Sequence, residues 1–205
     1  MANICCSKYV FYTNDDKSEL LRLHMNLMAI MDNNDSKTGC LDDVAIKHGV
    51  DREKISCRGT IENLDDYNPA NNYFTLNSDT AWAPTDELWE AVIAQYKGIS
   101  FVYIAEECGE SIYVNTDTEG VYFPERYLLE ICGDAPIPDG WFAGQDKPPF
   151  VEIREYFETF DDLNSYCIKL TGIDFDTIDE LQDYISDLFD EEGNTISNVI
   201  EFSES

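Results

Sequence analysis

The feature that most constrains the fold lies between residues 82 and 132, where a helix pattern is followed at once by three strand patterns. The helix begins near Pro84, with Thr85 or Asp86 at its cap. Its apolar residues share one face by their spacing, namely Leu88, Trp89, Val92, Ile93 and Tyr96. Beyond it, apolar residues alternate from Phe101 to Ala105, and turn sequences at 108–111 and 117–120 separate three β-rich segments. The pattern predicts a helix packed on an antiparallel meander.

The segments before residue 82 predict an α+β fold. Strand-like composition runs from Asn3 to Thr13 and is followed by an amphipathic helix over 20–31. A short helix over 41–48 ends at Gly49, and 55–64 and 72–78 are two further predicted strands. The predicted order as far as residue 132 is therefore β-α-α-β-β-α-β-β-β, with helices packed on one face of an antiparallel sheet.

The composition changes from Gly133 to Phe150, where Pro and Gly punctuate the chain too often for a regular element. Trp141 and Phe142 either anchor this segment to the core or contact a partner, and we favour the anchor. The rest of the chain predicts strand, helix, helix and strand. We therefore predict a domain over 1–132, a connecting loop over 133–150, and an acidic β-α-α-β extension over 151–205 that packs on the first domain or continues it.

The net charge of the chain is -29, yet 43% of its residues are hydrophobic, as expected of a folded protein with an acidic surface. Direct binding to nucleic acid is not expected, because carboxylates repel phosphates. The excess is uneven: residues 1–99 hold 16 Asp and Glu against 9 Lys and Arg, and residues 100–205 hold 26 against 4. This acidic excess is explained either by binding to a basic partner or by solubility alone.

Seven cysteines, an odd number without a CxxC pair, predict free thiols in a reducing compartment. The sequence shows neither a signal peptide nor an apolar run as long as a membrane span, so a cytoplasmic protein that does not enter membranes is expected. His24 and His48 have ordinary structural explanations. We expect no metal and no cofactor.

A resemblance to a known family rests on a few short matches. The chain opens with Met1, Ala2, Asn3 and Cys5, has Trp82 and Pro84 at a helix start, and has Phe101, Glu106 or Glu107, and Gly109 along a strand and its turn. In these features residues 1–132 resemble the YubB-like proteins of plasmids, phages and conjugative elements. The resemblance implies a ferredoxin-like antiparallel sheet with helices on one face, and a mobile-element setting. It implies no activity, cofactor or catalytic residue.

The sequence contains few residue patterns that indicate catalysis or metal binding. Asn115, Asp117, Glu119 and Gly120 resemble half of a calcium loop, but Arg126 occupies the position where a bidentate Glu would close the cage. The sequence contains none of the common nucleophile, zinc or phosphate-loop motifs, so an enzyme is not expected. The alternative function is a small hydrolase or ligand-binding domain, with a pocket formed by Tyr103, Glu106, Glu107 and Tyr113.

The last predicted helix carries a row of acidic residues on its polar side, Asp176, Asp179, Glu180, Asp183, Asp187 and Asp190. Like charges three and four residues apart repel one another. Steps of four residues correspond to about 6 Å along a helix, comparable with the spacing of phosphates on a nucleic-acid strand. A solvated face is the ordinary explanation. The functional hypothesis is a non-catalytic interaction module from a mobile element, which mimics nucleic acid and blocks a basic host DNA-binding or defence protein.

Overall fold

A computed structural model describes residues 3–32, 39–107, 109, 112–132, 137–142, 150–189 and 196–204. These residues divide into two compact units, one extending to Thr118 and the other comprising Glu119–Ser203. Each unit has its own hydrophobic core and combines helices with an antiparallel sheet. The predicted α+β class is confirmed.

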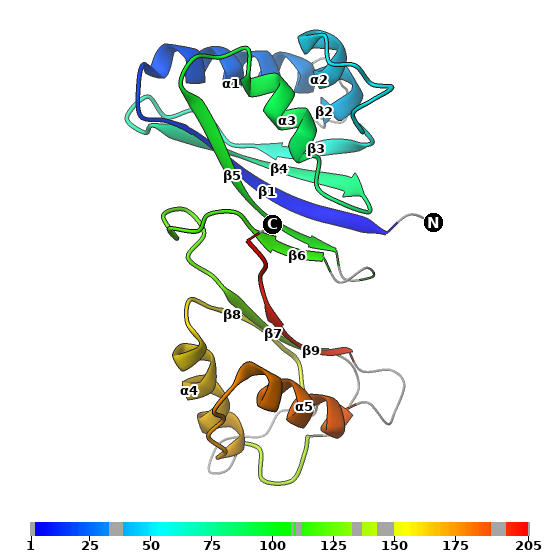
Figure 1. The fold of residues 1–205 in the computed structure, drawn as a ribbon, viewed down its shortest axis with the longest axis vertical. Coiled ribbons are helices and arrows are strands. Elements are labelled where there is room, and N and C mark those ends of the chain that lie inside the picture. The colour runs from blue at the N-terminus through cyan, green and yellow to red at the C-terminus, as the bar shows by residue number, and fades with distance from the viewer. Residues whose placement is uncertain are drawn as a thin grey trace. The chain divides into compact units, whose positions relative to one another are not determined.

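The first unit is a six-stranded sheet with helices α1, α2 and α3 on one face (Figure 1). Its elements are β1 (Ile4–Thr13), α1 (Lys17–Met31), β2 (Gly39–Cys40), α2 (Leu41–His48), β3 (Gly59–Leu64), β4 (Tyr73–Ala81), α3 (Asp86–Ile93), β5 (Ile99–Glu107) and β6 (Ile112–Asn115). The strand order is β2-β3-β4-β1-β5-β6, and every neighbouring pair is antiparallel. Helix α1 begins where the Asp16 carboxylate accepts a hydrogen bond from the Ser18 N–H, at 2.9 Å.

The core of the first unit forms between β1 and the helices. Alternate side chains of a strand share a face, so Tyr9 and Phe11 both point toward α3. The ring of Trp89 lies 5.6 Å from that of Tyr9 and 5.2 Å from that of Phe11. Leu88, Trp89 and Val92 are all fully buried, which confirms the predicted face of this helix.

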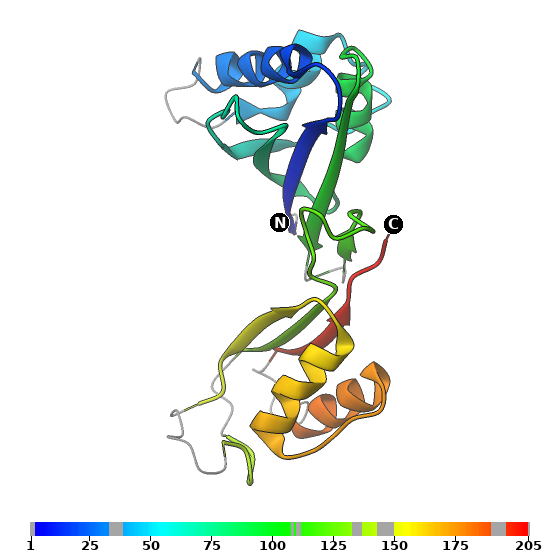
Figure 2. The ribbon, with the colours of Figure 1, turned by 90° about the vertical axis from the view of Figure 1, so that its left-hand side faces the viewer.

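The second unit is a three-stranded sheet with two helices on one face (Figure 2). Its elements are β7 (Tyr127–Cys132), β8 (Ile153–Phe157), α4 (Phe160–Thr171), α5 (Ile178–Phe189) and β9 (Ile196–Glu201), and the strand order is β8-β7-β9. The Thr159 hydroxyl caps α4 by accepting a hydrogen bond from the Asp162 N–H, and Gly172 ends this helix with a φ of 80°.

The predicted three-strand meander is wrong at its last strand. Strand β7 pairs with β8 and β9, not with β6, and so belongs to the second sheet. The chain accordingly divides after Thr118 rather than after Cys132, and the tail from residue 151 is not a separate extension, because β7 lies between its two strands. A strand pattern reports that a segment is extended but does not identify its partners.

The segment between β7 and β8 connects two paired strands of one sheet, and is not a linker between domains. Trp141 is fully buried in the second core, where its indole N–H donates to the Tyr184 hydroxyl at 3.1 Å. The Phe142 N–H donates to the Leu170 carbonyl at 3.0 Å. The favoured role of these two residues as an anchor is confirmed.

Candidate functional site

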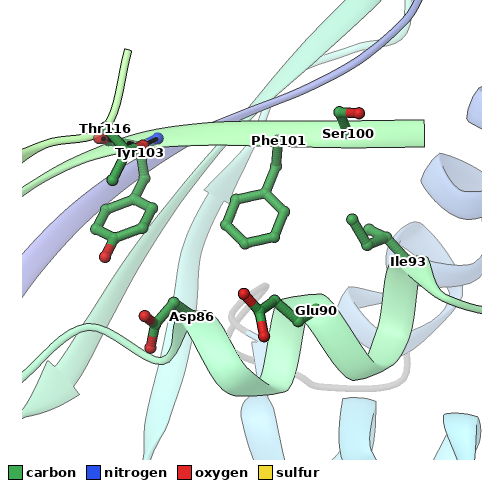
Figure 3. A pocket seen from close by; sticks show the side chains of 7 residues that line it. All are labelled: Asp86, Glu90, Ile93, Ser100, Phe101, Tyr103 and Thr116. Carbon is green, nitrogen blue, oxygen red and sulfur yellow. Dashed lines mark hydrogen bonds between the residues drawn. The ribbon is translucent and has the colours of Figure 1, made fainter. Parts of the chain in front are cut away.

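A hollow of about 320 Å³ lies between α3 and β5 in the first unit. Its lining residues are Asp86, Glu90, Ile93, Ser100, Phe101, Tyr103 and Thr116. Figure 3 shows the carboxylates of Asp86 and Glu90 on α3 directed toward the rings of Phe101 and Tyr103 on β5. The volume is at the lower end of the range for ligand pockets.

The helical wall of this hollow follows from residue spacing. Asp86 and Glu90 are four residues apart on α3, so they lie one turn from each other on the same side of the helix. Between them in sequence, Trp89 fixes the helix to the sheet from a fully buried position. The carboxylates are therefore held at the border between the core and the solvent.

The strand wall is equally fixed. Phe101 and Tyr103 alternate along β5 and share a face, and their rings lie 5.9 and 5.2 Å from the ring of Tyr9. The Thr116 hydroxyl accepts a hydrogen bond from the Tyr103 N–H at 2.8 Å, and the Thr116 N–H donates to the Tyr103 carbonyl at 2.9 Å. Two carboxylates facing two aromatic rings form an environment suited to a positively charged group.

The four side chains of the alternative pocket do not come together. Tyr103 and Glu107 lie on the helix side of β5, whereas Glu106 lies on the opposite side, directly across from Tyr113. Glu107 is 2% exposed, and its carboxylate accepts a hydrogen bond from the Gly109 N–H at 2.9 Å. Of the four residues, only Tyr103 lines the hollow.

The sequence interpretation missed the two acidic residues of the hollow. Asp86 and Glu90 flank the apolar face of a helix that had been predicted, and their spacing of four residues was the available signal. That signal is weak in a chain with 42 acidic residues. The spacing of Asp86 and Glu90 indicates a candidate site only once the structure places the rings of Phe101 and Tyr103 opposite them.

The acidic row of α5 has the geometry that its spacing predicts. Asp179, Asp183 and Asp187 are exposed, while the residues buried against the sheet are Leu181, Ile185 and Phe189. Asp176 is also exposed, just before the helix. None of the ion pairs found among the described residues involves these four carboxylates. We refer to Asp176, Asp179, Asp183 and Asp187 as the acidic face.

Two predicted members of the row stand apart from this face. The Glu180 carboxylate accepts a hydrogen bond from the Asp176 N–H at 3.0 Å, so it helps to cap the start of α5. Asp190 lies outside the described residues. The acidic face therefore has two residues fewer than the predicted row: Glu180, which has a capping role, and Asp190, which the structure does not describe.

The remaining candidates for chemistry have structural roles. The Asn115 side chain accepts a hydrogen bond from the Asp117 N–H at 3.0 Å, which is a local turn contact. Nε2 of His24 lies 2.8 Å from the Asp65 carbonyl, and Nδ1 of His48 lies 2.9 Å from the Val44 carbonyl. Burial lowers the pKa of His48. Over the described ranges, no three His, Cys, Asp or Glu side chains gather as metal ligands.

Six cysteines fall within the described residues, and all six are free thiols, while Cys108 lies outside them. Burial raises the pKa of Cys167 to about 12. Burial and the neighbouring Asp79 carboxylate raise the pKa of Cys6 to about 11. Thiolates are the reactive form of cysteine, so neither residue has the character of a nucleophile.

No family model, curated protein or solved structure matches this chain. No helix in the described parts of the chain is both long enough and apolar enough to span a membrane. The two candidate functional surfaces of the described residues are the hollow beside β5 and the acidic face of α5.

Proposed function

We propose that the protein is a non-catalytic interaction module that binds a basic surface of another protein through the acidic face of α5. The observation that carries this proposal is the arrangement of charge on the helix: one side is buried in the core, and the other presents carboxylates that no described Lys or Arg neutralises. Residues 119–203 hold 21 Asp and Glu against 4 Lys and Arg.

The acidic face costs stability in the isolated protein. Asp179, Asp183 and Asp187 succeed one another at four-residue steps, and each like-charged pair destabilises a helix by about 0.2–0.5 kcal/mol. A basic partner would remove this repulsion on binding. The rise along the helix is about 6 Å per step, so the row presents a regular series of negative charges, as a nucleic-acid strand does. A protein that binds phosphates in a basic cleft is the corresponding class of partner.

We further propose that the first unit is a ferredoxin-like domain. Support comes from the succession β1-α1-β3-β4-α3-β5 with the spatial order β3-β4-β1-β5, in which each helical crossover passes over one strand. In this proposal β2, α2 and β6 are additions. The YubB-like resemblance stays a hypothesis, and with it the mobile-element setting and a host DNA-binding or defence protein as the partner.

A triple variant tests the proposed binding surface. Asp179→Asn, Asp183→Asn and Asp187→Asn together remove three charges and conserve side-chain size. Full-length protein would be immobilised, incubated with host lysate and eluted with a salt gradient, and eluted proteins would be identified by mass spectrometry. Electrostatic binding predicts a basic partner that elutes at moderate salt and is lost from the triple variant.

The matched control removes three exposed carboxylates elsewhere in the same unit, with Glu152→Gln, Glu155→Gln and Glu158→Gln. This control has the same net charge as the triple variant, but it should retain the partner because its acidic face is intact. If both variants lost binding equally, total charge rather than the acidic face would be responsible. If the triple variant bound as tightly as the wild type, α5 would simply be a solvated helix.

A further inference from the structure

We infer that the edge of β5, next to the hollow under α3, binds an extended peptide that carries a Lys or Arg side chain and adds to the sheet as a strand. This site lies in the first unit. It uses none of the residues of the acidic face, so it does not depend on the function proposed above. The inference rests on an unpaired stretch of sheet edge and on the charge of the hollow beside it.

Among the described residues, half of β5 has no strand partner on its outer side. Strand β6 pairs with Ile104–Glu107, and Thr116 extends that pairing to Tyr103. Alternate residues of an antiparallel strand direct their N–H and C=O groups to the same side, so those of Phe101 point outward as those of Tyr103 do. Within the described parts of the chain, no strand pairs with Ile99–Val102 on that side.

This edge lacks three common kinds of protection against a new strand. Natural edge strands are commonly blocked by Pro, Lys or a bulge. The β5 sequence ISFVYIAEE contains neither Pro nor Lys. Its register with β1 runs without interruption from Thr13 opposite Ile99 to Cys6 opposite Glu106. The strand is therefore regular and able to accept main-chain hydrogen bonds from an added peptide.

The hollow determines which side chain the peptide needs. A peptide residue directly opposite Phe101 places its side chain on the same face of the sheet as the Phe101 ring. That face borders the hollow, where the carboxylates of Asp86 and Glu90 face the rings of Phe101 and Tyr103 (Figure 3). A Lys or Arg side chain there gains charge pairing and cation–π contact together. An acidic side chain would be repelled.

The first test uses a defined peptide with blocked ends, Ser-Thr-Val-Lys-Val-Thr-Ser, and its Arg counterpart. Titration of full-length protein, followed by calorimetry and by amide resonances, should show saturable binding and slower hydrogen exchange at the Phe101 N–H. Acetylating the lysine side chain removes only the charge. Methylating the lysine backbone nitrogen removes only the strand pairing. Each change should weaken binding at least about fivefold.

The second test changes the protein. Asp86→Asn with Glu90→Gln should weaken binding of the lysine peptide about fivefold to thirtyfold, because both charges of the hollow are lost. The control pair Asp66→Asn with Glu87→Gln removes the same charge from exposed positions of this unit outside the hollow. Binding by the control should stay within about twofold of the wild type.

Several results would overturn the inference. Failure of both unmodified peptides to bind would do so directly. Equal binding of the backbone-methylated peptide would show charge attraction without strand addition, and equal binding of the acetylated peptide would remove the role of the hollow. A dimer of this chain that protects the Phe101 N–H without peptide would show that the edge serves a second copy instead.

Discussion

Replacing Trp89 with Ala should lower the free energy of unfolding of the first unit more than truncating any other side chain of α3. Trp89 is fully buried and packs its ring against Tyr9 and Phe11 on the central strand. Helix α3 is only eight residues long, so its stability depends on packing rather than on its own hydrogen bonds. Trp89 is the largest of the three side chains that attach this helix to the core, the others being Leu88 and Val92.

The size of the effect can be worked out from the contacts. A buried Trp removes about 150–250 Å² from water, worth about 4–6 kcal/mol at 25 cal/mol per Å². The two ring pairs add about 1–3 kcal/mol. The indole N–H has no hydrogen-bond partner among the described residues, and removing it returns a similar amount. The last two contributions cancel, so we expect a loss of about 4–6 kcal/mol, at or slightly above the upper end for Trp→Ala changes.

Hydrogen exchange measured by mass spectrometry can follow each unit separately, which matters because a chain with two cores need not unfold in one step. Peptides from β1 report on the first unit and peptides from β7 on the second. Trp89→Ala should lower the protection of β1 by the amount above. Trp89→Phe, which keeps a ring and loses the unpaired N–H, should cost less than about 2 kcal/mol.

The control is Trp82→Ala, because Trp82 is 44% exposed and lies outside the buried core. It should change the protection of β1 by less than about 1 kcal/mol. The reasoning would be refuted if Trp89→Ala cost no more than this control. Equal costs for Trp89→Phe and Trp89→Ala would show that the indole N–H makes a stabilising hydrogen bond, contrary to the account above.

Three further predictions concern single contacts. Because burial raises the pKa of Cys167 above its unfolded value near 9, the folded state holds this proton more tightly, so this residue should cost the second unit up to about 1.4 kcal/mol of stability per pH unit from pH 9 toward pH 12. Cys167→Ala should make the slope of stability against pH shallower by that contribution in pH-dependent denaturation, while the raised pKa values of Tyr127 and Tyr166 leave a remaining slope. Asp79→Asn should lower the pKa of Cys6 and speed its alkylation at pH 8, which peptide mass spectrometry can measure against Cys167 as an unreactive internal reference. Thr159→Ala removes the cap of α4 and should cost about 1 kcal/mol in urea denaturation, whereas Thr159→Ser should cost little.

The parts of the fold that could be predicted are those decided by local chemistry. Pro84 and Thr85 indicate where α3 starts, although the Thr85 side chain makes no cap hydrogen bond in the structure. The buried face follows from residue spacing and agrees with the structure. Strand β7 could be predicted as a strand but not placed. Its partner in β9 is distant in sequence, with Tyr127 opposite Glu201, and alternation alone carries no information on such pairings.

The candidate surfaces, like the fold, were predictable only in part from the sequence. Periodicity was enough to gather Asp179, Asp183 and Asp187 on one side of a helix. Periodicity does not show that Glu180 is engaged in a cap. The available signal was the capping-box spacing from Thr177 to Glu180, and in the structure the Glu180 N–H donates to the Thr177 hydroxyl at 3.2 Å. The hollow was out of reach of the sequence, since it depends on where β6 stops pairing with β5 and on how Thr116 then fixes Tyr103.

The position of β7 has a consequence for the order in which the chain folds during synthesis. All strands of the first sheet have been synthesised once Asn115 has been added. This unit can therefore begin to fold while the second unit is still being made. The second sheet cannot close until β9 is available as far as Glu201. Until then β7 has an uncovered edge and exposed apolar side chains. That interval is when the nascent chain is most open to aggregation and to capture by chaperones.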